Sequence, residues 1–154
     1  MKRNFFVNIL IAFVPIVVVA VVGTLFVNNG MDWMTNLNKP SEWVPNFLIP
    51  IVWSVIYLST AIIIYLWIRK NDMPVNIAIL FLVNGILNIL WCLLFFQLHL
   101  IFVGLVAIIL NLIFAILLWV SVYRTRKTFA YILAIYPVWL CIATTLNLAL
   151  WILN

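Results

Sequence analysis

Long apolar runs separated by short polar breaks dominate this chain. The breaks leave five apolar segments, at residues 5–27, 47–68, 75–98, 100–123 and 129–153. A hydrocarbon core ~30 Å thick is crossed by about 20 helical residues, so each segment is long enough to span a membrane. The pattern therefore predicts an all-α integral membrane protein: one membrane domain, residues 1–154, folded as a bundle of five transmembrane helices.

The third and fourth segments are separated by a very weak break. Residues 73–123 contain no Asp, Glu, Lys or Arg, and their only polar interruption near the middle is Gln97-Leu98-His99. As one helix this stretch would reach ~77 Å at 1.5 Å per residue, more than twice the bilayer core. We therefore expect a tight turn around Leu98 and His99.

The first segment has a competing interpretation as a cleaved signal peptide, because Val18-Val19-Ala20 resembles a cleavage site. Its apolar run of 23 residues is longer than the usual signal core of about 7–15 residues, which favours a membrane span.

The longest break follows this segment and is about 19 residues long, well above the usual length of a connection. Pro40 and Pro45 lie within it, and Pro50 follows at the start of the second segment. Each proline lacks an amide hydrogen and restricts the residue before it, so the connector cannot be one regular helix. We expect a stiff, shaped loop that lids a pocket between the helices.

Composition agrees with a lipid environment. The chain is 69% hydrophobic and 7% charged, whereas soluble domains carry about 25% charged residues. Its net charge of +5 is not gathered into a basic patch, so nucleic acid is not an expected partner. With five spans, one side holds seven basic residues and the other holds Lys39 alone. The positive-inside rule then predicts a cytoplasmic amino terminus, with the carboxyl terminus and the first connector on the outer side.

Conventional catalytic and metal sites are not indicated. Cys92 and Cys141 lie in apolar runs, where free thiols behave as small hydrophobic groups, and no metal site or required cofactor is expected. His99 is the only histidine, and a polar turn residue is a better interpretation than a haem ligand. The spans contain no carboxylate, lysine or serine–histidine set for acid–base or nucleophilic catalysis in the dark.

Three segments carry aromatic and amide side chains on one helical face by i, i+3 and i+4 spacing. The faces are Pro50, Trp53, Tyr57 and Ala61; Asn84, Asn88, Trp91 and Phe95; and Tyr136, Trp139, Ala143, Asn147 and Leu150. Counting residues inward from the outer end of each segment, at 1.5 Å per residue, places the three faces at similar depths beneath the first connector. One interpretation is that the amides bond helix to helix while the indoles fill core volume. Taken together, the faces instead favour a shared pocket for a large, flat, mostly apolar ligand.

The same residues resemble the translocator protein family, also called tryptophan-rich sensory protein or peripheral-type benzodiazepine receptor (TspO/MBR). The matching positions are Trp33, Leu37, Lys39-Pro40-Ser41, Pro45, Trp53, Tyr57, Leu87-Asn88, Trp91, Phe95-Phe96, Tyr136, Trp139, Ala143-Thr144-Thr145-Leu146-Asn147, Trp151 and Leu153-Asn154. The chain departs from the family pattern at Glu42-Trp43-Val44-Pro45 and at Tyr136-Pro137, and it ends before the sterol motif of animal members.

The resemblance implies five helices, a homodimer, and a cavity under the first connector for porphyrins and drug-like apolar aromatics. It also implies light-dependent porphyrin degradation, with Trp53 and Trp139 as redox partners. Lys39, the only outward basic residue, is the candidate for binding porphyrin carboxylates. The expected ligand-binding residues are Trp33, Lys39, Pro40, Trp53, Tyr57, Asn84, Asn88, Trp91, Phe95, Tyr136, Trp139, Ala143, Leu146 and Asn147.

Two other functions remain open from sequence. One is a transporter of porphyrins or other small molecules, although the spans carry no charge and no inverted repeat. The other is a membrane assembly partner without a ligand, in which small residues such as Gly104 and Ala107 allow close helix packing.

Overall fold

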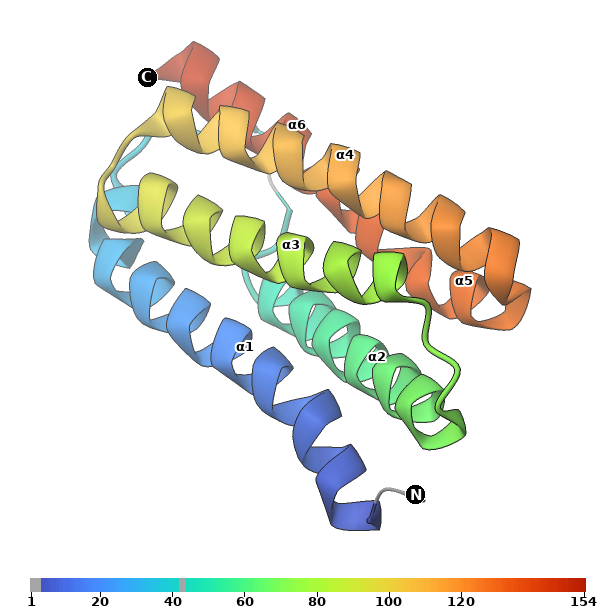
Figure 1. Ribbon diagram of the computed structural model, residues 1–154. Helices are drawn as coiled ribbons and strands as arrows, with labels where there is room; N and C mark the ends of the chain where they lie inside the picture. The colour runs from blue at the N-terminus through green and yellow to red at the C-terminus, as the bar shows by residue number, and fades with distance from the viewer. Residues whose placement is uncertain (1–3, 42–43) are drawn as a thin grey trace.

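The computed structural model describes residues 4–41 and 44–154, and within those ranges the chain is helical with short connections (Figure 1). The elements are α1 (Phe5–Thr35), α2 (Leu48–Lys70), α3 (Val75–Cys92), the π-helical turn η1 (Leu93–Gln97), α4 (Ile101–Thr125), α5 (Lys127–Leu133) and α6 (Ile135–Leu153). Five helical segments are long and apolar enough to cross a membrane, counting α3 with η1 and α5 with α6. The predicted five-helix membrane fold is confirmed.

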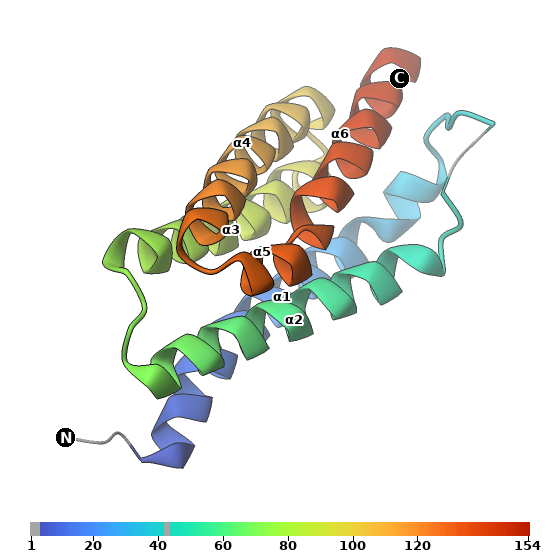
Figure 2. The ribbon, with the colours of Figure 1, turned by 90° about the vertical axis from the view of Figure 1, so that its right-hand side faces the viewer.

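The helices form a bundle in which α4 packs against both α3 and α6, while α1 packs against α2, α3 and η1. The two chain ends lie at opposite ends of the bundle (Figure 1), as five crossings require. The α1–α2 connector lies at the same end as the carboxyl terminus (Figure 2). We call this the connector end and the opposite one the amino-terminal end.

Large apolar side chains cover the outside of the bundle. Phe6, Leu82 and Ile152 are each more than 60% exposed, with values of 72%, 63% and 68%. A surface of this kind is stable only against lipid, because burying apolar area away from water is the main favourable contribution to folding. The protein is therefore a multi-pass integral membrane protein.

Two helices are interrupted for identifiable reasons. Pro137 has no amide hydrogen for the carbonyl of Leu133, and α5 gives way to α6 at Ala134. At the end of α3, the Leu98 amide donates to the carbonyl of Leu93, five residues earlier, at 2.9 Å. His99 follows with a left-handed φ of 57°, and α4 begins at Ile101. This turn agrees with the tight reversal predicted around His99, whereas the π-helical turn was not predicted.

The first helix is longer than its predicted span. It continues past Val27 to Thr35, because residues 28–35 contain no proline and the first proline of the connector is Pro40. Trp33 consequently lies on α1, and the connector covers residues 36–47 instead of about 19 positions. Glu42 and Trp43, where the sequence departs from the family pattern, lie outside the described residues, as do the basic residues Lys2 and Arg3.

The connector is tied to the end of α6 by a pair of amides. The backbone N–H of Asn38 donates to Asn154 Oδ1 at 2.9 Å, and Asn154 Nδ2 donates to the backbone carbonyl of Asn38 at 3.1 Å. Asn38 Nδ2 also donates to the Leu153 carbonyl at 3.3 Å. We call this arrangement the Asn38–Asn154 clasp. It holds the first part of the connector over the bundle.

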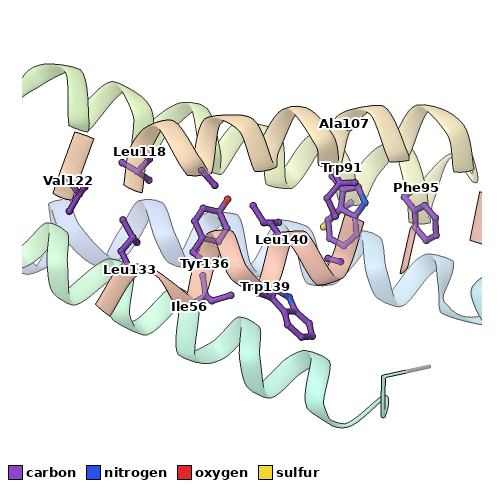
Figure 3. Packing of buried hydrophobic residues seen from close by; sticks show 14 of the residues in the cluster. Ile56, Trp91, Phe95, Ala107, Leu118, Val122, Leu133, Tyr136, Trp139 and Leu140 are labelled. Carbon is purple, nitrogen blue, oxygen red and sulfur yellow. The ribbon is translucent and has the colours of Figure 1, made fainter. Parts of the chain in front are cut away.

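The interior changes character along the membrane normal (Figure 3). Val122, Leu118 and Leu133 pack near the amino-terminal end, while Trp91 and Phe95 lie towards the connector end. At the amino-terminal end, Arg126 also forms an ion pair with Asp72. The core at the amino-terminal end also contains rings, since Trp67 meets Phe81 and Phe129 edge-on. The rings towards the connector end form the candidate site.

Candidate ligand-binding site

The aromatic faces of α2, α3 and α6 meet in the connector half of the bundle. The Trp53 ring stacks near Trp91, with centroids 6.2 Å apart, and near Tyr57, at 5.5 Å. Tyr136 meets the same indole in a T-shaped contact at 6.4 Å. The three helices whose ring-bearing faces were predicted to point inward therefore share one aromatic cluster around Trp53.

A small cavity, the connector-end chamber, lies on one side of this cluster. Its volume is about 50 Å³. It is lined by Met34, Ile49, Trp53, Trp91, Phe95, Phe96, Trp139, Ala143, Leu146, Asn147 and Leu150. Three indoles and two phenyl rings thus surround one space, which suits a flat apolar molecule.

A second cavity, the central chamber, lies deeper in the membrane and has a volume of about 40 Å³. It is lined by Ile16, Val19, Trp53, Ile56, Tyr57, Thr60, Phe81, Asn84, Gly85, Asn88, Leu118 and Tyr136. Its walls combine apolar side chains with two amides and three hydroxyl groups. Polar groups at this depth are costly unless they are hydrogen-bonded.

Trp53 lines both chambers and divides them. Sequence spacing predicts one shared hollow, whereas the described residues place two small cavities there, because the stacked rings of Trp53, Tyr57 and Trp91 occupy the space between them. Helical spacing indicates which face a residue occupies, but the volume left between faces depends on how the large rings pack.

Hydrogen bonds between helices use several of the predicted residues. The Tyr57 hydroxyl donates to Asn88 Oδ1 at 3.1 Å, joining α2 to α3. Trp91 Nε1 donates to Asn147 Oδ1 at 3.3 Å, joining α3 to α6. These contacts agree with the alternative interpretation, in which the amides bond helix to helix. The amides therefore have a structural role whether or not a ligand binds.

Other polar atoms at the two chambers have no hydrogen-bond partner among the described residues. At the connector-end chamber this is the indole nitrogen of Trp139, a side chain only 5% exposed. At the central chamber the unpaired atoms are Asn84 Oδ1 and Asn88 Nδ2. A buried donor or acceptor without a partner is destabilising, so a hydrogen bond from a bound molecule to one of these atoms would be especially stabilising.

Eleven of the fourteen expected ligand-binding residues line one chamber or the other; the exceptions are Trp33, Lys39 and Pro40. Trp33 stacks on His99, with ring centroids 4.3 Å apart, and meets Phe95 edge-on at 5.5 Å. It therefore supports the α3–α4 turn. Lys39 and Pro40 are half-buried on the connector.

Sequence reasoning missed Asn111 of α4. Its side chain is fully buried, and its Oδ1 accepts a hydrogen bond from the Tyr136 hydroxyl at 3.0 Å. The available signal was a single amide in the middle of an apolar span, which marks an inward position. Asn111 lies on the fourth segment, which carries no aromatic and amide face like those of the second, third and fifth segments.

Comparison with known proteins gives a consistent assignment. Residues 11–152 match the family described as TspO/MBR. The chain belongs to the TspO/MBR family. A tryptophan-rich protein TspO from Archaeoglobus fulgidus is 35% identical over 136 residues, covering 86% of this chain and 87% of that protein. Its counterpart from Chlorobaculum tepidum is 33% identical over 138 residues, covering 86% of each chain. Protein CrtK from Rhodobacter capsulatus is 30% identical over 132 residues, covering 79% of this chain and 78% of the relative.

The tryptophans of this TspO/MBR member fall into two groups. Trp53, Trp91 and Trp139 line the connector-end chamber. Others pack elsewhere: Trp67 is fully buried among apolar residues, and Trp119 Nε1 donates to the Ala130 carbonyl at 2.9 Å. Among the tryptophans that the structure describes, those of the first group therefore form a cavity wall, whereas Trp67 and Trp119 pack the core away from it.

Proposed function

We propose that this protein is a membrane receptor or sensor that binds porphyrins and other flat, mostly apolar aromatics in the connector-end chamber. The observation that carries the proposal is the convergence of Trp53, Trp91, Phe95 and Trp139 on one space beneath the connector. Indole and phenyl faces stack on an aromatic macrocycle, and Trp139 Nε1 supplies an unused donor for an acceptor on the ligand.

Binding must enlarge the chamber. Pockets for molecules of this size have volumes of about 300–1,000 Å³, whereas the connector-end chamber has about 50 Å³. Trp53 is only half-buried, and the connector is fastened by the few hydrogen bonds of the Asn38–Asn154 clasp. We expect the ligand to displace the Trp53 ring and lift the connector, so that association is slower than diffusion.

We further propose that bound porphyrin is degraded in the light. Light absorption makes the macrocycle a strong oxidant, and the indole of Trp53 or Trp139 donates one electron to it. The indole becomes a radical cation and the porphyrin a radical anion, which reacts with dioxygen. Return of the electron to the indole restores the tryptophan, so that the net reaction adds one dioxygen to one porphyrin and opens its ring. Such a photoreaction requires ring contact but no acid–base pair.

Membrane orientation forms part of the same proposal. We expect the connector end on the outer side and the amino terminus in the cytoplasm, because basic residues concentrate at the amino-terminal end. Lys39 would then be the only basic side chain at the connector end, near the carboxylates of a bound porphyrin. We also expect a homodimer, as the family resemblance implies, and no nucleic-acid partner.

Transport is not favoured by the packing. Below the central chamber, the side chains of Ile63, Trp67, Val122 and Leu133 are each no more than 1% exposed. A path through the bundle would have to open this layer. Porphyrin uptake into liposomes containing the purified protein, compared with protein-free liposomes, tests this alternative directly.

The proposal is tested by titrating the purified protein with protoporphyrin in the dark while following tryptophan fluorescence, and then recording porphyrin absorbance under illumination. Saturable quenching followed by protein-dependent loss of absorbance is expected. Quenching that rises linearly without saturation would reject specific binding, and photolysis equal to that of free porphyrin would reject the degradation step.

A further inference from the structure

A continuous line of aromatic rings leads from the connector end of the bundle to Trp53. At its outer end the exposed His99 ring stacks on Trp33, with centroids 4.3 Å apart and planes 13° from parallel. Trp33 meets Phe95 edge-on at 5.5 Å, and Phe95 stacks near Trp91 at 6.3 Å (Figure 3). Trp91 in turn lies 6.2 Å from Trp53. All these separations are those of rings in contact, and we call the five rings the ring chain.

The two ends of the ring chain have different surroundings. Trp53 lines both chambers inside the bundle. Trp33 is half-buried two residues before the end of α1, and the exposed Asp32 precedes it. Because a charged side chain is strongly disfavoured in hydrocarbon, this end of the ring chain lies where the membrane meets water. The ring chain therefore joins the chamber walls to the aqueous surface.

The proposed photoreaction, on which this inference rests, gives such a connection a use. Electron transfer from Trp53 to the excited porphyrin leaves an indole radical cation and a porphyrin radical anion. When the anion passes its electron to dioxygen, which becomes superoxide, the porphyrin is restored and no electron returns to Trp53. The oxidised indole must then be reduced from another source, or it reacts irreversibly.

We propose that the ring chain carries an electron from the aqueous surface to oxidised Trp53, and that a small, water-soluble one-electron reductant such as ascorbate delivers it at Trp33. Trp91 donates one electron to Trp53, and Trp33 donates one to Trp91 across the Phe95 ring, which bridges the indoles without being oxidised. The reductant then restores Trp33. The net reaction moves one electron from the reductant to dioxygen and leaves the porphyrin unchanged.

Hydrogen bonding keeps the oxidised site on the indoles. Tyr57 and Tyr136 also contact Trp53, but a phenol is readily oxidised only when its hydroxyl proton leaves at the same time. Both hydroxyls donate to asparagine side-chain oxygens, on α3 and α4, and a neutral amide is a hydrogen-bond acceptor but not a base. An indole needs no proton loss to become a radical cation, so Trp91 is the neighbour that reduces Trp53.

The proton also explains why the oxidised site moves outwards. Trp91 Nε1 donates to Asn147 Oδ1 at 3.3 Å, again an amide, so its radical cation keeps the proton and remains a strong oxidant. At the surface, the Trp33 radical cation releases its Nε1 proton to water and becomes a neutral radical. The oxidised site is then held at Trp33 until the reductant returns one electron and a proton is taken up.

Trp139 lies outside the ring chain. It lines the connector-end chamber, but among the described residues no ring contact like those of Trp53 and Trp91 includes it. The two candidate redox indoles therefore differ: oxidised Trp53 is reduced through the ring chain, whereas oxidised Trp139 is not.

The test is flash photolysis of the porphyrin-loaded protein in air, with the tryptophan radical followed by transient absorption at increasing ascorbate concentration. Ascorbate is charged and does not enter an apolar chamber, so it reduces only a ring at the surface. We expect the radical lifetime to shorten several-fold as ascorbate is added. A lifetime that ascorbate does not change would overturn this inference and leave light-driven degradation standing; the absence of any tryptophan radical would overturn both.

Variants of Trp33 assign the surface site. Trp33→Phe keeps a ring against Phe95 and His99 but removes the oxidisable indole, so the lifetime should no longer respond to ascorbate. Trp33→Tyr should restore much of the response, because a phenol at the surface can lose its proton to water; a merely structural role for Trp33 predicts no such difference between the two variants.

Trp151→Phe is the matched control. Trp151 is an indole near the end of α6, 45% exposed, and it contacts Phe102 outside the ring chain. Its variant should respond to ascorbate like the unaltered protein. A response that Trp33→Phe retains, that Trp33→Tyr fails to restore, or that Trp151→Phe loses would overturn the assignment of Trp33.

Discussion

The two chambers share one wall, the Trp53 indole, yet the rest of their walls differ. In the connector-end chamber the Asn147 amide is already used, since its Oδ1 accepts from Trp91 and its Nδ2 donates to the Ala143 carbonyl. The rest of this chamber's wall consists mainly of aromatic rings. In the central chamber the rings are fewer and the amides of Asn84 and Asn88 retain unused atoms. An asparagine therefore differs between the two chambers: its amide is fully hydrogen-bonded within the bundle in one and keeps an unpaired atom in the other.

The two chambers also differ in rigidity: the connector-end chamber can enlarge, whereas the central chamber and the core below it are fixed. A chamber of rings can enlarge by rotation of a half-buried side chain such as Trp53. The central chamber is held by hydrogen bonds between α2 and α3 and between α4 and α6, and the core below it is closely packed. Rotation of Trp53 also changes one wall of the central chamber, but the hydrogen bonds between the helices and the core below them can stay in place.

The largest effect should come from filling one chamber and then the other. Ala143→Phe places a ring in the connector-end chamber, and overpacking of about 1–3 kcal/mol corresponds to roughly a 5- to 150-fold loss of porphyrin affinity. Thr60→Leu fills the central chamber instead and should change affinity much less. Dark fluorescence titrations measure both. A greater loss in Thr60→Leu would mean that the ligand occupies the central chamber.

Replacement of the candidate redox indoles should separate chemistry from binding. Trp53→Phe and Trp139→Phe keep an aromatic face but remove the more readily oxidised ring, so we expect light-driven loss of porphyrin absorbance to slow several-fold. Dark affinity should fall by less than about tenfold, because one neutral hydrogen bond contributes about 0.5–1.5 kcal/mol. Trp119→Phe, at a residue that lines neither chamber, is the control. Unchanged photolysis in both variants and in the double variant would end the redox assignment.

A smaller effect is expected at Lys39, which lies on the connector and lines neither chamber. Lys39→Ala should weaken protoporphyrin binding by about two- to fivefold, since exposed ion pairs contribute about 0.2–1 kcal/mol. A neutral drug-like ligand should be unaffected, and added salt should reduce the difference between the two ligands. Equal losses for both ligands would remove Lys39 from carboxylate recognition.

The sequence predicts the helices and their inward faces, but not how the side chains of different helices pack together. The apolar runs determine five membrane helices, and i, i+3 spacing places Asn88 and Trp91 on one face of α3. Trp91 stacks near Trp53 there, and Asn88 accepts a hydrogen bond from Tyr57. The sequence predicts Trp33 in the connector because Asn28, Asn29, Gly30 and Asp32 interrupt the apolar run, although nothing there prevents a helix from continuing. The division of the pocket by Trp53 depends on ring packing between distant segments, which spacing within one helix cannot determine. The Tyr136–Asn111 bond likewise joins helices whose relative rotation is fixed only in the folded bundle.

The smallest equilibrium effect should arise at the Asn38–Asn154 clasp. Asn154→Ala removes hydrogen bonds that hold the connector to α6 without altering either chamber wall. If the ligand reaches the connector-end chamber by lifting the connector, both association and dissociation of porphyrin should accelerate by similar factors while Kd changes little, because the clasp opens before binding and reforms after it. Stopped-flow fluorescence measures the two rates, and Asn36→Ala, whose side chain bonds only within α1, is the matched control. Unchanged rates in Asn154→Ala would show that access to the chamber does not pass beneath the connector. The ligand would then enter the connector-end chamber from the side, between the helices.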